Sequence, residues 1–135
     1  MRIVILLIMA IMSMQFVSAQ IHWSETKDWK LYKANTSILF RSPPDSLAIL
    51  KAYPLNRDSI IAFLNEATIL PKETPSATWM GGFAATFKYD GKRRKLLISS
   101  YGGYVFDSES KRYYQLPSES KNEWFEYINS CASNL

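Results

Sequence analysis

The chain has 135 residues, of which 47% are hydrophobic, 14% aromatic and 21% charged, and its formal net charge is +4. This length and composition predict a single globular domain and exclude a disordered chain. One histidine excludes a multi-histidine metal site, and one cysteine excludes an internal disulfide framework and a cysteine-cluster zinc site. We therefore predict no metal and no cofactor.

The first segment has the layout of a secretory signal peptide. A basic residue, Arg2, precedes an apolar stretch that ends near Val17, and small residues follow it. Val17 and Ala19 suit the positions before a cleavage site, so we predict that residues 1–19 are removed. The alternative is a membrane anchor, but the stretch is short for a membrane span. Cleavage leaves one α+β domain, residues 20–135, which we place in the periplasm or outside the cell, with no stable membrane span.

Export changes the interpretation of Cys131. In an oxidising compartment this residue has no internal partner, so it either links two chains or stays a free thiol. Its spacing from Tyr127 and Ile128 places it on the apolar face of a C-terminal helix, which favours burial.

The mature chain begins with a predicted β-hairpin. Residues 28–33 alternate between apolar and polar side chains, as a half-buried strand does. The turn-forming residues 35–37 follow, and residues 38–41 then form the return strand.

A helix–break–helix unit is expected next. A short helix over residues 45–53 ends or kinks at Pro54. A second helix begins at Asn56 or Asp58, and its apolar positions follow a 3.6-residue period as far as Ala67.

The second half predicts a β-meander of about four strands. Asp90-Gly91 is a strong hairpin signal, and Gly102-Gly103 breaks or bends the chain. The expected strands cover residues 83–89, 95–101, 104–107 and 111–116.

Together these elements predict an α+β fold with an antiparallel sheet, built from the meander and the N-terminal hairpin. The helix–break–helix unit and a C-terminal helix, which begins at a capping box of Ser120 and Glu123, pack on one face. The other face is left to solvent or to a partner. This order of elements is similar to that of secreted enzyme-inhibitor modules such as the β-lactamase inhibitory proteins, and the similarity lies in the layout alone.

No catalytic constellation is visible, so we predict a protein that is not an enzyme and has no catalytic residues. His22 lies close to the predicted mature N-terminus, where a catalytic base would lack the partners that orient it. Asp107 and Glu109 share one turn, and no two acids stand out as a glycosidase pair. The mild positive charge of an exported chain gives no indication of nucleic-acid binding.

The candidate binding residues are aromatic, glycine and arginine residues of the second half. Residues 99–104 place two glycines between tyrosines, which gives an adaptable backbone with large amphipathic rings. Trp79 stands near two further glycines, and residues 113–114 point one tyrosine ring to each sheet face. Arg93 and Arg94 can pair with carboxylates in a bidentate manner. The candidate partner-binding residues are Tyr101, Gly102, Gly103, Tyr104, Arg93, Arg94, Trp79 and Tyr114.

These residues also have structural interpretations, because the aromatic rings could belong to the core and the basic run could keep a hairpin end soluble. As a set they favour a secreted or periplasmic protein-binding module, an inhibitor or immunity-type protein that blocks a secreted or periplasmic enzyme or toxin. The alternative is a small glycan-binding or glycan-cleaving envelope domain, and a third hypothesis is an assembly module that adds strands at a sheet edge. A ligand-sized cleft with a perturbed acid would favour the glycan domain, and a flat aromatic patch would favour the inhibitor.

Overall fold

The computed structural model describes residues 21–71, 82–100 and 102–133, so the predicted signal peptide lies outside the described residues. The helices are α2 (Thr36–Arg41), α3 (Arg57–Glu66) and α4 (Lys121–Ser133), with 3-10 helices η1 (Trp23–Glu25), η2 (Pro44–Ile49) and η3 (Ser118–Ser120). The strands are β1 (Lys27–Lys33), β2 (Tyr53–Pro54), β3 (Thr68–Ile69), β4 (Phe83–Tyr89), β5 (Lys92–Ser99), β6 (Tyr104–Asp107) and β7 (Arg112–Gln115).

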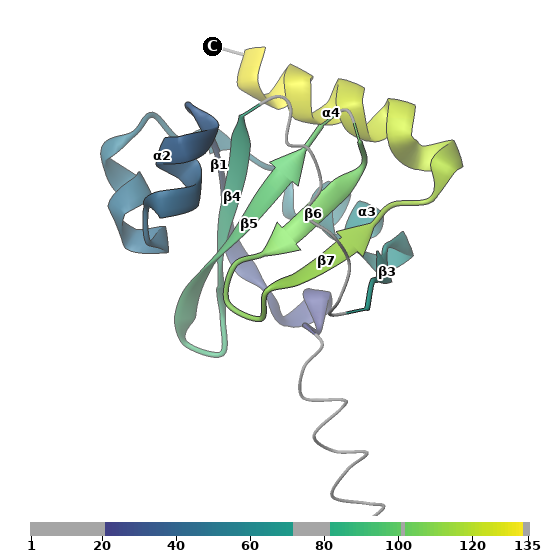
Figure 1. Ribbon diagram of the computed structural model, residues 1–135, viewed down its shortest axis with the longest axis horizontal. Helices are drawn as coiled ribbons and strands as arrows, with labels where there is room; N and C mark the ends of the chain where they lie inside the picture. Colours follow the sequence, from purple (N-terminus) through teal and green to yellow (C-terminus); the bar gives the residue numbers. More distant parts are fainter. Residues whose placement is uncertain (1–20, 72–81, 101, 134–135) are drawn as a thin grey trace, which may run out of the picture.

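The described strands form one antiparallel sheet in the order β2-β1-β4-β5-β6-β7-β3. Helix α4 runs along one end of the sheet, and α3 lies behind the sheet (Figure 1). Helix α2 lies at the left of the view and packs on the opposite sheet face. The predicted α+β class and the antiparallel sheet are confirmed. Beside the four meander strands, the sheet contains the predicted first strand β1 and the two-residue strands β2 and β3 at its edges, which were not predicted.

The meander itself follows the predicted hairpin order. Asp90 and Gly91 have φ angles of +54° and +75°, the two left-handed conformations that a type I′ turn requires. Tyr89 therefore pairs directly with Lys92 across the turn.

The predicted strand over residues 38–41 is wrong, because this segment belongs to helix α2. The side chain of Asn35 caps the helix by accepting a hydrogen bond from the Ser37 amide at 2.8 Å. The polar residues that resemble a hairpin turn are therefore a helix start, and β1 pairs with β2 and β4 instead.

The predicted helix–break–helix unit is only half correct. The first helix is replaced by η2, and Tyr53 and Pro54 form strand β2 against β1. The second helix, α3, is confirmed, and Asn56 caps it by accepting a hydrogen bond from the Ser59 amide at 3.0 Å. Pro54 therefore lies in a short strand between two helical segments and does not kink one helix.

The larger core lies between the sheet and helices α3 and α4. Trp29 stacks on Phe87 with a ring-centroid separation of 4.5 Å, and Trp23 meets Tyr114 edge to face at 5.5 Å. Trp124 of α4 is fully buried in the same core. Aromatic rings of η1, the sheet and α4 thus fix the helices on this face.

The start and the end of α4 differ in detail from the prediction. Ser120 lies in η3, and its hydroxyl donates a hydrogen bond to Glu66 of α3 at 2.9 Å, so it ties α4 to α3 and is not a capping residue. Cys131 packs at the edge of the core as expected, but it is half-buried and not fully buried.

Residues 35–50, which contain α2 and η2, form a flap over part of the opposite sheet face. Leu39 and Leu47 of the flap are buried against Tyr32, Ala84 and Leu97, and these five residues make a second, smaller core. The prediction that helices pack on one face therefore holds for α3 and α4, whereas the flap covers a part of the sheet that was expected to be open.

Lys95 of β5 fastens the flap to the sheet. Its side chain is buried, with the whole residue 3% exposed. The ammonium group donates hydrogen bonds to the carbonyl oxygens of Leu39 at 2.7 Å, Phe40 at 3.3 Å and Ser42 at 2.6 Å. These carbonyls lie at the C-terminal end of α2, where a cation is favoured. Burial lowers the pKa of Lys95 from its ordinary value of 10.5, and the three acceptors offset the cost of burying the charge.

We predict that Lys95→Met lowers the free energy of unfolding by about 2–4 kcal/mol, because it removes the donor to three carbonyl groups at the end of α2. Urea denaturation measures this loss. The matched control is Lys92→Met on the same strand, whose exposed ammonium contacts Glu109 at 2.8 Å and should contribute less than about 1 kcal/mol. Equal losses in the two variants would refute the anchoring role of Lys95.

Candidate functional site

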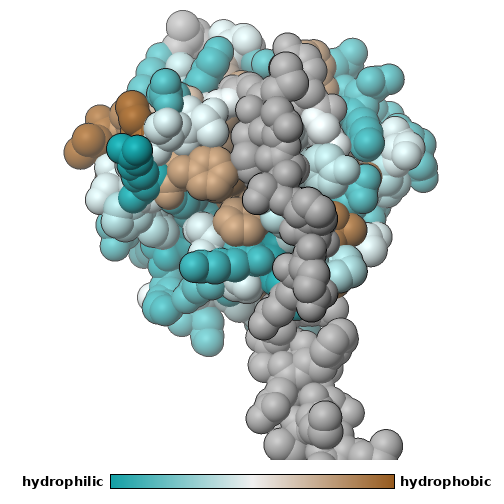
Figure 2. Space-filling view, in the orientation of Figure 1, coloured by the Kyte–Doolittle hydropathy of each residue, from teal (hydrophilic) through white to brown (hydrophobic). Residues whose placement is uncertain are grey.

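The candidate surface lies on the sheet face that carries the flap. Among the described residues, the exposed large hydrophobic side chains are Ile38, Phe40 and Ile49, which are 49%, 43% and 90% exposed. All three belong to the flap. Figure 2 shows brown apolar side chains on this side of the molecule, from the flap toward the centre of the view. Exposed apolar side chains that gather in one region are typical of a contact surface.

Strands β6 and β7 continue this surface with half-buried aromatic side chains. Phe106 and Tyr113 are cross-strand partners with ring centroids 4.7 Å apart, and Phe106 also packs against the core under the flap. Tyr104 lies on the same face of β6, and its hydroxyl accepts a long hydrogen bond of 3.5 Å from Gln115. Tyr104 is therefore a predicted binding residue that lies on the same sheet face as the flap.

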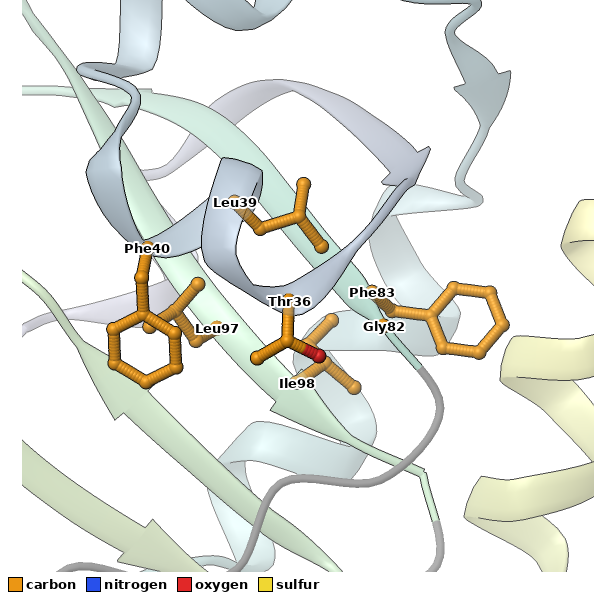
Figure 3. A pocket seen from close by; sticks show the side chains of 7 residues that line it. All are labelled: Thr36, Leu39, Phe40, Gly82, Phe83, Leu97 and Ile98. Carbon is orange, nitrogen blue, oxygen red and sulfur yellow. The ribbon is translucent and has the colours of Figure 1, made fainter.

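A small pocket opens where the flap meets the sheet (Figure 3). Its volume is about 190 Å³, including space open to solvent. In Figure 3, Phe40 and Thr36 extend from α2 toward the sheet, and Leu97 of β5 lies between them. The lining is almost entirely apolar, so the pocket does not suit a polar substrate. The lining residues are Thr36, Leu39, Phe40, Gly82, Phe83, Leu97 and Ile98.

Gly82, one of the lining residues, lies close to the backbone of Ala34. Its φ angle is +57°, a conformation that favours glycine. A Cβ atom at this position would lie 2.4 Å from the carbonyl oxygen of Ala34. The two backbone segments therefore approach too closely for any residue other than glycine.

Arg93 and Arg94 point to opposite sheet faces, and each is held by a carboxylate. Arg93 lies on the flap side, where its Nη2 is 2.5 Å from Asp28 Oδ2. Arg94 pairs with the fully buried Asp107, and its Nε lies 2.8 Å from Glu109 Oε2. Arg94 thus stabilises the meander, while Arg93 stays next to the candidate surface.

The remaining predicted residues lie away from this surface or outside the described residues. Tyr114 is buried on the α3 and α4 side, where burial and the charge of Asp107 raise its pKa. It borders a second hollow of about 500 Å³, including space open to solvent, between η1, the end of α3 and strands β3 and β7. Trp79 and Tyr101 lie outside the described residues.

Gly102 and Gly103 shape the turn between β5 and β6. Gly103 has a φ angle of +67°, and a Cβ atom there would lie 2.9 Å from the side chain of Lys121 at the start of α4. A Cβ atom at Gly102 would lie 2.9 Å from the ring of Tyr104. The two glycines therefore let the turn fit closely against α4 and Tyr104, and a direct binding role for them stays a prediction.

Several carboxylates of the described residues are engaged in structural contacts, namely those of Asp28, Glu66, Asp107 and Glu109. A hydrogen bond from Arg93 holds the pKa of Asp28 below its ordinary value of 3.8, and one from Lys92 holds the pKa of Glu109 below 4.5. A glycosidase needs one acid with a raised pKa next to its substrate. Neither of the two pockets described above has a carboxylate in its lining.

Sequence reasoning missed the exposed residues of the flap. Ile38 and Phe40 fell in the segment assigned to a strand, and Ile49 fell on the apolar side of an expected helix. One signal was available, because three consecutive apolar residues in a short helix cannot all face one core. Only Leu39 of the three is buried.

In comparisons with known proteins, no family model matches the chain, and neither a curated protein nor a solved structure matches it significantly. The layout similarity to secreted inhibitor modules therefore stays a prediction. Within residues 21–71, 82–100 and 102–133, no helix combines the length and hydropathy needed to cross a membrane. The same residues contain no group of three or more histidine, cysteine, aspartate or glutamate side chains that could hold a metal ion.

Acid titration tests the ion pairs at the edge of this site. Because the pKa values of Asp28 and Glu109 are lowered in the folded protein, the unfolded chain takes up protons first as the pH falls. Their stabilisation is complete above about pH 5 and is lost as the pH falls through the folded-state pKa values. The urea midpoint of the Asp28→Asn/Glu109→Gln variant should therefore depend less on pH in this range than that of the wild type. An unchanged pH dependence would show that these contacts do not stabilise the fold.

Proposed function

We propose that residues 20–135 form an exported, non-catalytic protein-binding module, an inhibitor or immunity-type protein that blocks a secreted or periplasmic enzyme or toxin. The observation that carries this proposal is the exposure of Ile38, Phe40 and Ile49 on the flap, next to the aromatic side chains of β6 and β7. Burying such side chains against a partner is favourable by roughly 25 cal/mol per Å² of apolar surface. Aromatic side chains at the centre of such a surface often dominate the binding energy.

The charges of the site favour binding over glycan cleavage. The pocket beside the flap has no carboxylate in its lining, and the hydrogen bonds on Asp28 and Glu109 favour their ionised forms. A general acid would need the opposite shift in pKa. The glycan-cleaving alternative therefore gains no support from the described residues.

The sheet edges give little support to strand addition. The edge strands β2 and β3 have two residues each, and Pro54 of β2 has no amide hydrogen to donate. A partner that extended the sheet would need a longer open edge.

Export depends on the signal peptide, so its cleavage is a direct prediction. When the full chain is expressed in a secreting bacterial host, the exported protein should begin at Gln20, because Val17 and Ala19 suit the cleavage site. Intact-mass spectrometry identifies this end. Retention of residues 1–19 on the exported protein would favour a membrane anchor instead.

Affinity capture tests the binding proposal. The mature chain is immobilised and exposed to envelope and secreted fractions of the source organism and of its competitors. We expect one stoichiometric protein whose retention falls at least about tenfold with Phe40→Ala or Tyr104→Ala, since losing a central aromatic contact costs more than about 1.4 kcal/mol. The matched control is Phe125→Ala, a half-buried aromatic residue on α4.

The outcome is interpreted together with thermal stability. If Phe40→Ala and Tyr104→Ala lower the melting temperature strongly but leave retention unchanged, these side chains are structural and the proposed surface is wrong. If Phe125→Ala removes the partner and the flap variant does not, the binding surface lies on α4.

A further inference from the structure

The flap adjoins a set of basic side chains on the same face of the sheet. Lys30 and Lys95 lie on either side of Thr86 in one register row across β1, β4 and β5. Lys88 and Arg93 are partners in the next row. Because alternate residues of a strand point to the same face, Lys30, Lys88 and Arg93 share the face with the flap.

Helix α2 adds a further cation, since Arg41 is exposed directly after Phe40. We name Lys30, Arg41, Lys88 and Arg93 the basic strip. Asp28 offsets one of these charges through its ion pair with Arg93, and the charges of Lys30 and Lys88 also lower the pKa of Asp28. The basic strip therefore keeps a net positive charge beside the apolar side chains of the flap.

We propose that the flap and the basic strip together dock a partner protein segment in which carboxylate side chains flank an apolar anchor. This inference rests on the proposed function and specifies the chemistry of its partner. The apolar anchor packs against the exposed side chains of Ile38 and Phe40, next to the shallow pocket between α2 and the sheet. The carboxylates meet the cations of the basic strip, which steer the two proteins together.

The geometry of Arg93 favours a protein segment over an anionic membrane. Its guanidinium is fixed by Asp28 at 2.5 Å and by the Thr86 hydroxyl at 3.4 Å. A fixed guanidinium loses little conformational entropy when it binds a carboxylate in one geometry. A lipid surface needs only mobile positive charge and apolar side chains that insert, so neither a fixed arginine nor a pocket would be required.

The test uses three defined probes with the isotope-labelled mature chain. One is a short synthetic peptide with Glu and Asp around a central Phe and Leu, the second carries Lys and Arg in place of the acids, and the third is a vesicle of equimolar phosphatidylcholine and phosphatidylglycerol. The acidic peptide should shift the amide resonances of residues 35–50 and of β1 and β4. Its affinity should fall as salt rises, because salt screens the exposed charges.

Two matched variants separate the basic strip from overall charge. Lys30→Gln/Lys88→Gln removes two charges of the strip and should weaken the acidic peptide about three- to tenfold. Lys111→Gln/Lys121→Gln removes the same charge in the β6–β7 turn and at the start of α4, and should leave the affinity unchanged.

Each outcome decides between the proposals. Equal affinity for the acidic and basic peptides, no binding of either, or an unchanged affinity in Lys30→Gln/Lys88→Gln would overturn the inference. Vesicle binding without peptide binding would assign the surface to a membrane. A captured protein that depends on Phe40 but not on Lys30 and Lys88 would support the proposed function and refute the acidic partner. Charge-dependent peptide binding without any captured protein would support the acidic-segment preference and refute the inhibitor function.

Discussion

A buried ammonium group holds the flap on the sheet, and the candidate surface depends on this contact. Among the described residues, no carboxylate accepts a hydrogen bond from Lys95, and its ammonium group donates to three carbonyl oxygens at the end of α2. A buried charge is tolerated only where such acceptors surround it. The contact sets which side of α2 faces inward, so Leu39 packs on the sheet while Ile38 and Phe40 are exposed. The apolar surface, the pocket and their closeness to the basic strip all follow from the position of α2.

Local sequence signals predicted the fold well where they act over a few residues. The turn at Asp90-Gly91 was identified, and Asn56 was one of the two helix starts considered, because each signal is complete within four residues. The flap was not predicted, because the residues from Asn35 to Ser37 suit a turn and a helix cap equally. Hydrogen bonds from Lys95 stabilise the helical conformation, and Lys95 lies 56 residues from Leu39 in the sequence. The two-residue strands β2 and β3 are likewise fixed by their neighbours, since no periodicity can mark so short a segment.

The candidate site was harder to predict than the fold, because the sequence does not show which face of the sheet is covered by helices. Alternation indicated that Tyr113 and Tyr114 point to opposite faces, but only the helix packing shows that Tyr114 enters the larger core. Arg93 and Arg94 separate in the same way. Arg94 meets the buried Asp107 of β6, and this contact depends on the register of β5 against β6. A sequence does not reveal such a register. An arginine that the sequence suggests is available for binding can therefore form an ion pair on the core side of the sheet.

The account makes the flap a docked element whose position is set by Lys95, and amide hydrogen exchange of the Lys95→Met variant tests this most directly. Helix and turn amides of the flap, such as those of Leu39, Ser42 and Leu50, are hydrogen-bonded within it. The account predicts that their exchange accelerates in Lys95→Met, while amides shared by β4 and β5 keep their protection. Unchanged protection of the flap in that variant would contradict the account, because the candidate surface would then be held in place by the leucine contacts alone.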